Sequence, residues 1–332
     1  MNYETFKQVV KQHIKEYIPE NLGYLEPRFF EKRKVNELLD AICFENPRDK
    51  SAASPTLYIN DMYEQYKEFD NIDFVLKSTM EKLQEVYEHG IYLEDIVEKN
   101  GFEQNVIFQL INTEQNKELL EDLPHREFQD LSVIYRWMLE HDKLGTASFI
   151  IHNDMAEQMG VNEEKLYELA YENTKRIFPP VVRTMREVVA ELMFGNDAPE
   201  ELVDMMFEDE PTEAKMYVIT NTQKVNGAVS MLYKEEFQEL ANELEDNLLV
   251  MPSSVHELIA VKAGGWDVYE LAAMVEEINM EQVNLCDRLS NQVYCFDRKL
   301  GELQLATDTP SKRLDGKVAE RTVAYVELER GR

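Results

Sequence analysis

Residues 128–151, FQDLSVIYRWMLEHDKLGTASFII, decide the fold class of this chain. The first half is apolar and rich in β-branched and aromatic side chains, a polar turn follows at residues 141–145, and apolar residues return at 147–151. Two such runs around a short turn predict antiparallel strands joined as a β-hairpin. Asn153 or Asp154 then caps a helix that ends at Gly160, so the predicted unit is a hairpin followed by a helix.

The flanking sequence alternates between helical and strand patterns, which predicts an α+β fold. Three- and four-residue apolar spacing, N-cap residues and glycine or proline stops predict helices over residues 3–18, from 61, 71–89, 91–99, from 163, 184–194, 199–207, 234–244 and 267–279. Short apolar runs predict strands over 34–44, 55–59, 128–139, 147–151, 216–219, 228–233, 247–251, 255–261, 292–296 and 303–306. Residues 106–111 are apolar throughout and fit a strand or a buried helical turn equally well.

An internal repeat is indicated by the gapless alignment of residues 134–158 with residues 216–240. Gly145 aligns with Gly227, and Ser148 aligns with Ser230. The alignment predicts a second hairpin followed by a helix, with each glycine supplying a positive φ at its turn. The alternative is that any hairpin followed by a helix shows this degree of similarity.

These patterns predict an N-terminal α+β domain followed by two related hairpin-plus-helix modules. The predicted parts are the N-terminal domain at 1–120, the first module at 121–195, an acidic linker at 196–214, the second module at 215–306 and a polar tail at 307–332. The length of 332 residues agrees with more than one domain. A chain of this length buries enough surface to fold without disulfides or metal.

The chain is strongly acidic, with a formal net charge of −30 from 35 basic and 65 acidic residues. Residues 51–300 hold the whole excess. This balance argues against a nucleic-acid-binding protein, which would neutralise phosphates with Lys and Arg. Solvated helix faces explain the charge most simply, and a surface that imitates DNA or docks on a basic partner is the alternative.

The sequence predicts a cytoplasmic protein that does not enter membranes. Its three cysteines, Cys43, Cys286 and Cys295, show neither a disulfide pattern nor zinc-ligand spacing. The first residues lack the basic and then apolar layout of a signal peptide, and no apolar run reaches the ~18 residues that span a bilayer.

No nucleotide-binding, zinc-protease, nucleophile-elbow or EF-hand motif occurs, so we expect no cofactor and no metal. Two clusters nevertheless carry chemically versatile side chains. The first is His125-Arg126-Glu127, at the entrance of the long predicted strand, where it could bind an anion or transfer protons. A solvated loop is the simpler interpretation.

The second cluster is Ser253-Ser254-Val255-His256-Glu257, which follows Pro252. Serine, histidine and glutamate side by side suggest a hydrolase, but neighbours along a strand point to opposite faces. Ser254 and His256 could share a face. We therefore expect His256 to be partly exposed in a cleft, with Ser254 or an acidic side chain within hydrogen-bond reach.

Several of these motifs resemble one bacterial family that is known only as a domain of unknown function and whose members are commonly encoded near mobile-element genes. The similarity lies in residues 110–114, LLEDLPHRE at 119–127, 217–220, 226–228 and 252–257, and extends over about residues 1–300. It implies no activity, substrate, cofactor or catalytic residue, but it marks residues 123–127 and 252–257 as family features.

The sequence thus favours a non-enzymatic accessory or regulatory protein that binds a protein partner. The candidate partner- or ligand-binding residues are His125, Arg126, Glu127, Ser253, Ser254 and His256. One alternative is a hydrolase that uses His125 or His256. The other is an acidic decoy that imitates nucleic acid.

Overall fold

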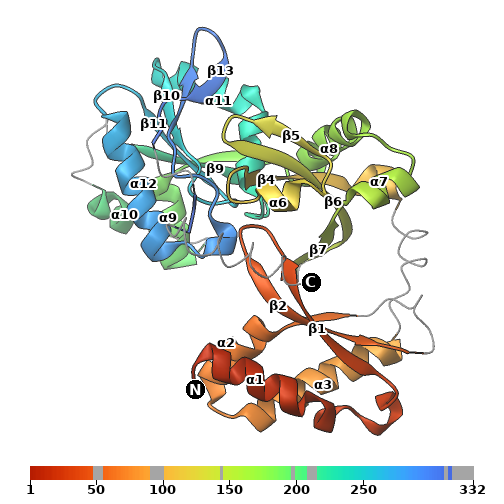
Figure 1. Cartoon of the computed structure of the whole chain (residues 1–332). Helices are drawn as coiled ribbons and strands as arrows, with labels where there is room; N and C mark the ends of the chain where they lie inside the picture. Colours follow the sequence, from red (N-terminus) through yellow and green to blue (C-terminus); the bar gives the residue numbers. More distant parts are fainter. Residues whose placement is uncertain are drawn as a thin grey trace. The chain divides into compact units, whose positions relative to one another are not determined.

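The structure is a computed structural model that describes residues 1–47, 55–89, 101–142, 145–195, 199–207, 215–309 and 313–315. The chain divides into two compact units, Met1–Gly101 and Phe102–Arg332. Each unit combines helices with antiparallel sheet (Figure 1), which confirms the predicted α+β class.

The first unit is a three-stranded antiparallel sheet, in the order β1-β2-β3, with helices packed on it. Its elements are α1 (Tyr3–His13), 3-10 helices η1 (Ile14–Tyr17) and η2 (Glu20–Leu22), β1 (Glu26–Arg33), β2 (Leu38–Glu45), β3 (Thr56–Tyr58), α2 (Ile59–Phe69) and α3 (Ile72–His89). Its predicted helices α1, α2 and α3 and its predicted strands β2 and β3 are confirmed. Strand β1 was not predicted, because its sequence EPRFFEKR is mostly charged.

The core of the first unit lies between β2 and the three α-helices, which Figure 1 shows together on one side of the sheet. Phe6 and Val10 of α1 are fully buried against Ile42 and Phe44 of β2. Those residues lie two apart along β2, so both face the helices, as the two-residue period of a strand requires. The predicted helix at 91–99 lies outside the described residues.

The second unit contains two sheets. The smaller sheet is built on β6 (Leu131–Asp142), which pairs with β4 (Val106–Asn112) on one side and with β5 (His125–Phe128) and β7 (Gly145–Ile150) on the other. The hairpin of β6 and β7 confirms the prediction from residues 128–151. Residues 106–111 form a strand, buried along its whole length.

The larger sheet has six antiparallel strands in the order β13-β12-β10-β11-β9-β8. Its strands are β8 (Pro180–Thr184), β9 (Met216–Asn221), β10 (Leu248–Met251), β11 (Leu258–Lys262), β12 (Tyr294–Asp297) and β13 (Glu302–Leu305). The helices of this unit are α5 (Phe102–Asn105), α6 (Lys117–Leu120), α7 (Asn153–Gln158), α8 (Glu163–Ile177), α9 (Met185–Phe194), α10 (Glu200–Met206), η5 (Gly227–Leu232), α11 (Lys234–Leu244), α12 (Val268–Gln282) and η6 (Leu285–Asp287).

Both faces of the larger sheet are covered, and β10 shows how the sequence achieves this. Leu248 and Val250 point into a core shared with α11 and the smaller sheet. Leu249 and Met251 point into a second core, against α12. Because successive residues of a strand face opposite sides, a strand that is buried on both faces is apolar at every position.

The predicted second hairpin is wrong. Residues 227–232 form the 3-10 helix η5 instead of a strand, so the segment after β9 contains no counterpart of β7. The positive φ values of this turn belong to Lys224, at 56°, and Asn226, at 51°, and not to Gly227. The equivalence of the serines fails as well. Ser148 accepts a hydrogen bond from Arg136 Nε, whereas Ser230 donates to the Thr220 carbonyl.

The boundaries also differ from the predicted ones. The units divide after Gly101 rather than at residue 120, because β4 pairs with β6 and so belongs to the second unit. Within the predicted acidic linker, α10 confirms the helix predicted over residues 199–207. The start of the predicted polar tail is packed against the fold, where Thr307 and Leu314 are buried and the Thr307 hydroxyl donates to Gln292.

No helix among the described residues combines the length and the apolar character needed to cross a bilayer.

Candidate functional site

A largely apolar groove lies on the larger sheet of the second unit, between strands β9 to β11 and helix α12. Its volume is about 510 Å³. Four methionines line it: Met185 at the start of α9, Met216 on β9, Met251 on β10 and Met274 on α12. Ile259, Trp266 and Ile278 extend the same apolar wall.

Helix α12 contributes to the groove because it is apolar on more than one side. Leu271 and Val275 are buried against the sheet. Met274 and Ile278, four residues apart and therefore neighbours on one helix face, are 50% and 47% exposed and line the groove. Exposed apolar side chains that gather along a groove mark an interaction surface, whereas isolated ones have no such meaning.

The polar end of the groove is formed by the second cluster that the sequence singled out. Ser253, Ser254, His256 and Glu257 all line the groove, next to Asp287 of η6. The His256 side chain is 37% exposed, and its Nε2 lies 3.3 Å from Asp287 Oδ1. The expected geometry is therefore confirmed, in that His256 is partly exposed in a cleft beside an acidic side chain.

The His256 ring is held from both sides. Its Nδ1 accepts a hydrogen bond from the Asn226 backbone N–H at 3.3 Å, which places the proton on Nε2, facing Asp287. The backbone of His256 is held equally, since its N–H donates to Ser254 Oγ at 3.0 Å and its carbonyl accepts from Thr220 Oγ1 at 2.8 Å. This ring therefore connects three segments at the mouth of the groove.

The same contacts argue against His256 as the base of a hydrolase. A general base needs a free ring nitrogen within reach of the nucleophile whose proton it removes. Here Nδ1 is occupied by Asn226, and Nε2 carries the proton that faces Asp287. Ser254 Oγ contacts the backbone of His256 and not its ring. Residues 255 and 256 form a bend before β11, so the assumption of a continuous strand from 255 is wrong.

The first sequence cluster is separate from the groove and has a structural role. Arg126 of β5 donates to both carboxylate oxygens of Glu163, each at 3.0 Å, and its guanidinium lies 3.9 Å from the centre of the Tyr167 ring. The Tyr135 hydroxyl donates to the same carboxylate. These bonds fix the N-terminus of α8 on the smaller sheet.

The electrostatics of this cluster follow from its contacts. Partial burial by itself would raise the pKa of Glu163, but the hydrogen bonds from Arg126 and Tyr135 outweigh that effect and lower it. Burial and the hydrogen bond to Glu163 raise the pKa of Tyr135.

The other two residues of this cluster have no contact with the groove. His125 Nδ1 lies 2.9 Å from the Leu123 carbonyl oxygen, and Glu127 is exposed. None of the residues 125–127 lines the groove.

The sequence analysis connected none of the methionines with His256, so most of the groove was missed. Met216, Trp266, Met274 and Ile278 are the side chains that the sequence did not connect with His256. One sequence signal of the groove was available in α12, where Met274 and Ile278 add a second apolar stripe beside Leu271 and Val275.

Among the described residues, no group of three or more His, Cys, Asp or Glu side chains has the arrangement of a metal site.

The family model that matches this chain is a family of unknown function, DUF5688, and it covers residues 3–298. The chain therefore belongs to that family, as the resemblance of its motifs indicated. Searches of curated proteins and of solved structures found no significant match. The groove and its polar end lie entirely within the matched residues.

Proposed function

We propose that this protein is a non-enzymatic accessory or regulatory protein that binds a protein partner through the methionine groove. The observation that carries the proposal is the open groove in which Met216, Met274 and Ile278 remain exposed beside Trp266. Methionine side chains are flexible and polarisable, so a surface that contains several of them adapts to apolar partners of different shape.

The charges of the groove favour a basic partner. Glu257 and Asp287 lie at its polar end, and none of the described residues that line it is Lys or Arg. The protein as a whole carries a formal charge of −30. A basic segment should therefore associate faster with this protein, and acidic segments should be repelled from the groove.

An amphipathic helix is the partner structure that fits best. A helix of this kind places apolar anchors at three- and four-residue spacing on one face and leaves its basic residues on the other. The apolar anchors would contact the four methionines and Trp266, and the basic side chains would reach Glu257 and Asp287 at the rim.

Trp266 provides a direct test, because it lines the groove while Trp137, the other tryptophan, is buried elsewhere. The probe is an 18-residue leucine–lysine peptide designed as an amphipathic helix, added to a Trp137→Phe variant. Binding should shift the emission of Trp266. A scrambled peptide of the same composition, which has no apolar face, should bind much more weakly.

Two double variants of equal chemistry locate the binding surface. Met274→Gln with Ile278→Gln should abolish the emission shift. Leu192→Gln with Met193→Gln, which changes two exposed apolar residues of α9 outside the groove, should leave the shift intact. Equal binding of the scrambled peptide, or an unchanged affinity of the Met274–Ile278 variant, would refute the proposal. Displacement of the peptide by a fatty acid at stoichiometric concentration would instead indicate a small-molecule site.

A further inference from the structure

Strand β8 lies at one edge of the larger sheet. Among the described residues it pairs with β9 alone, in the antiparallel register Val181↔Thr220 to Thr184↔Tyr217. An edge strand exposes backbone N–H and C=O groups that another extended chain can pair with.

The pairing with β9 shows which backbone groups of β8 point outward. The Thr222 N–H donates to the Pro179 carbonyl at 3.1 Å, so 179 and 222 form a hydrogen-bonded pair. Hydrogen-bonded and non-hydrogen-bonded pairs alternate along antiparallel strands, and the outward groups therefore belong to residues 180, 182 and 184.

Three of these outward groups have no hydrogen-bond partner in the part of the chain that the structure describes. The Thr184 N–H is already bonded to the Glu187 carboxylate at 2.7 Å, in the capping box of α9. Pro180 has no N–H. Its carbonyl, together with the N–H and C=O of Val182, forms a short hydrogen-bonding edge.

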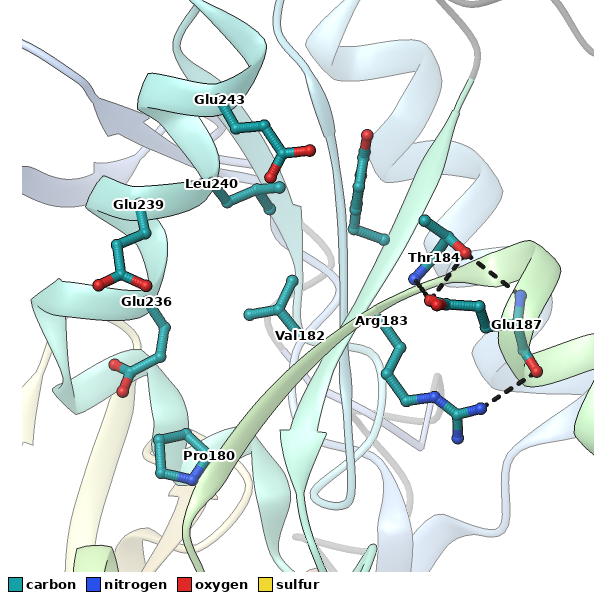
Figure 2. Close-up of a pocket in the computed structure, with 10 residues that line it drawn as sticks. Pro180, Val182, Arg183, Thr184, Glu187, Glu236, Glu239, Leu240 and Glu243 are labelled. Carbon is teal, nitrogen blue, oxygen red and sulfur yellow. Dashed lines mark hydrogen bonds between the residues drawn. The ribbon is translucent and has the colours of Figure 1, made fainter. Parts of the chain in front are cut away.

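A second pocket, of about 450 Å³, lies beside this edge, between β8 and α11. Figure 2 shows Val182 and Leu240 in the space between the two elements, with Glu236, Glu239 and Glu243 carried by α11. The three glutamates are spaced by three and four residues, which places them on one face of the helix. The pocket therefore has an apolar floor, an acidic wall and an open strand edge.

The acidic wall is not neutralised within the pocket. Arg183, the only basic residue among its described lining residues, is bonded to Glu191 and to the Glu187 carbonyl. Lys175 does not line the pocket, and it offsets negative charge at the start of α11, where its ammonium lies 3.4 Å from the Glu235 carboxylate. One buried oxygen of Glu236, Oε2, has no hydrogen-bond partner among the described residues.

From this geometry we infer a second docking surface, which binds an extended lysine- or arginine-bearing peptide as an additional antiparallel strand on β8. In an antiparallel pair, the residue that hydrogen-bonds with Val182 has its side chain on the same face as Val182, which here is the face of α11. Alternate residues of the peptide lie about 6.8 Å apart. Glu239 and Glu243 lie about 6 Å apart along the helix axis, so successive cationic side chains can reach successive glutamates.

This surface is distinct from the methionine groove. Tyr217 of β9 lines the acidic pocket, whereas Met216 lines the methionine groove, so the two sites lie on opposite faces of the sheet. A partner could therefore engage one surface while the other remains free.

The probe is a nine-residue fluorescent peptide with lysine at every second position and threonine or valine between, added to the full-length protein. Glu239→Gln with Glu243→Gln should weaken binding by about 2-fold to 30-fold, the range that two exposed ion pairs contribute. Glu277→Gln with Glu281→Gln, an equally spaced exposed pair on α12, should leave the affinity unchanged.

Two N-methylated peptides test the strand pairing itself. Methylation of the lysine amides removes the N–H groups that face Val182 and should abolish binding. Methylation of the intervening amides, which face away from β8, should preserve it. Exchange of the Val182 amide should also slow by roughly tenfold or more when the peptide binds.

Equal binding of the two methylated peptides, or an unprotected Val182 amide, would overturn the strand addition. An unchanged affinity of the Glu239–Glu243 variant would refute the proposal that the glutamates of α11 bind the cationic side chains of the peptide. Because its alternating sequence cannot form the apolar helix face that the methionine groove would bind, failure of this peptide to bind would leave the test of that groove unaffected.

Discussion

A side chain at position 227 would have to occupy the space of the His256 carbonyl oxygen. A Cβ built on Gly227 lies 2.3 Å from that oxygen and 2.2 Å from Thr220 Oγ1. Glycine is therefore required here by close packing rather than by its φ, since the residues of this turn with a positive φ are Lys224 and Asn226. The contact fixes the bend that holds His256 at the mouth of the methionine groove.

Gly227→Ala should destabilise the second unit by about 1–3 kcal/mol, because the Cβ collides with backbone that can only move as a segment. Urea unfolding followed by tryptophan emission measures the loss. Gly264→Ala is the matched control, since its Cβ meets only the end of the Asp246 side chain, at 3.1 Å, and it should cost much less. Equal costs for the two variants would contradict the packing explanation.

The bonds around Glu163 predict a pH-dependent contribution to stability. Glu163→Gln should lower the unfolding free energy by about 1–2 kcal/mol at pH 7, which is the value for hydrogen bonds to a charged group reduced for partial solvent access. The pKa of Glu163 is lowered from its usual 4.5, so the carboxylate contributes fully above pH 4.5 and loses its contribution as the pH falls through the folded-state pKa.

Denaturant titrations at pH 7 and pH 3.5 check this expectation. The difference in unfolding free energy between the wild type and Glu163→Gln should be smaller at pH 3.5 than at pH 7. The neighbouring Glu164 is exposed, so Glu164→Gln should have little effect at either pH. A difference that stays constant with pH would show that the carboxylate charge is not what stabilises the start of α8.

Element type was largely predictable where local signals agreed. Helix α11 has the predicted bounds 234–244, because an inward stripe of Phe237, Leu240 and Ala241 alternates with exposed glutamates. Asn162 accepts from the Lys165 N–H, as expected of an N-cap.

The failures occurred where tertiary contacts override local pattern. Residues 227–232 are apolar and resemble a strand, but Gly227 packs under the His256 carbonyl and the segment coils into η5. The groove was unpredictable for a similar reason, because the side chains of α12, β9 and α9 that line it are brought together only by the sheet. Sequence alone identified the polar end, through Ser254 and His256, but not the apolar walls.

Burial distinguishes two apolar residues that belong to the same core. Phe237 is 1% exposed and its ring lies 5.7 Å from that of Phe296, whereas Leu232 is only partly buried at the edge of the same core. Phe237→Ala should therefore cost about 3–5 kcal/mol, and Leu232→Ala should cost clearly less than the ~2–5 kcal/mol of a fully buried leucine. Thermal or urea unfolding of the two variants checks the order, and the reverse order would mean that η5 packs more deeply than the structure shows.

The two units have separate apolar cores, and this separation predicts two unfolding transitions. The core around Phe6 contains only residues of the first unit, and both tryptophans, Trp137 and Trp266, belong to the second. Phe6→Ala should lower the unfolding free energy of the first unit by about 3–5 kcal/mol, because it leaves a cavity in a fully packed core.

The tryptophan emission transition of Phe6→Ala should stay in place while an earlier transition appears in the far-ultraviolet circular dichroism. Phe237→Ala should do the opposite and move the emission transition. If Phe6→Ala shifted the emission transition as much as Phe237→Ala does, the two units would unfold as one cooperative body.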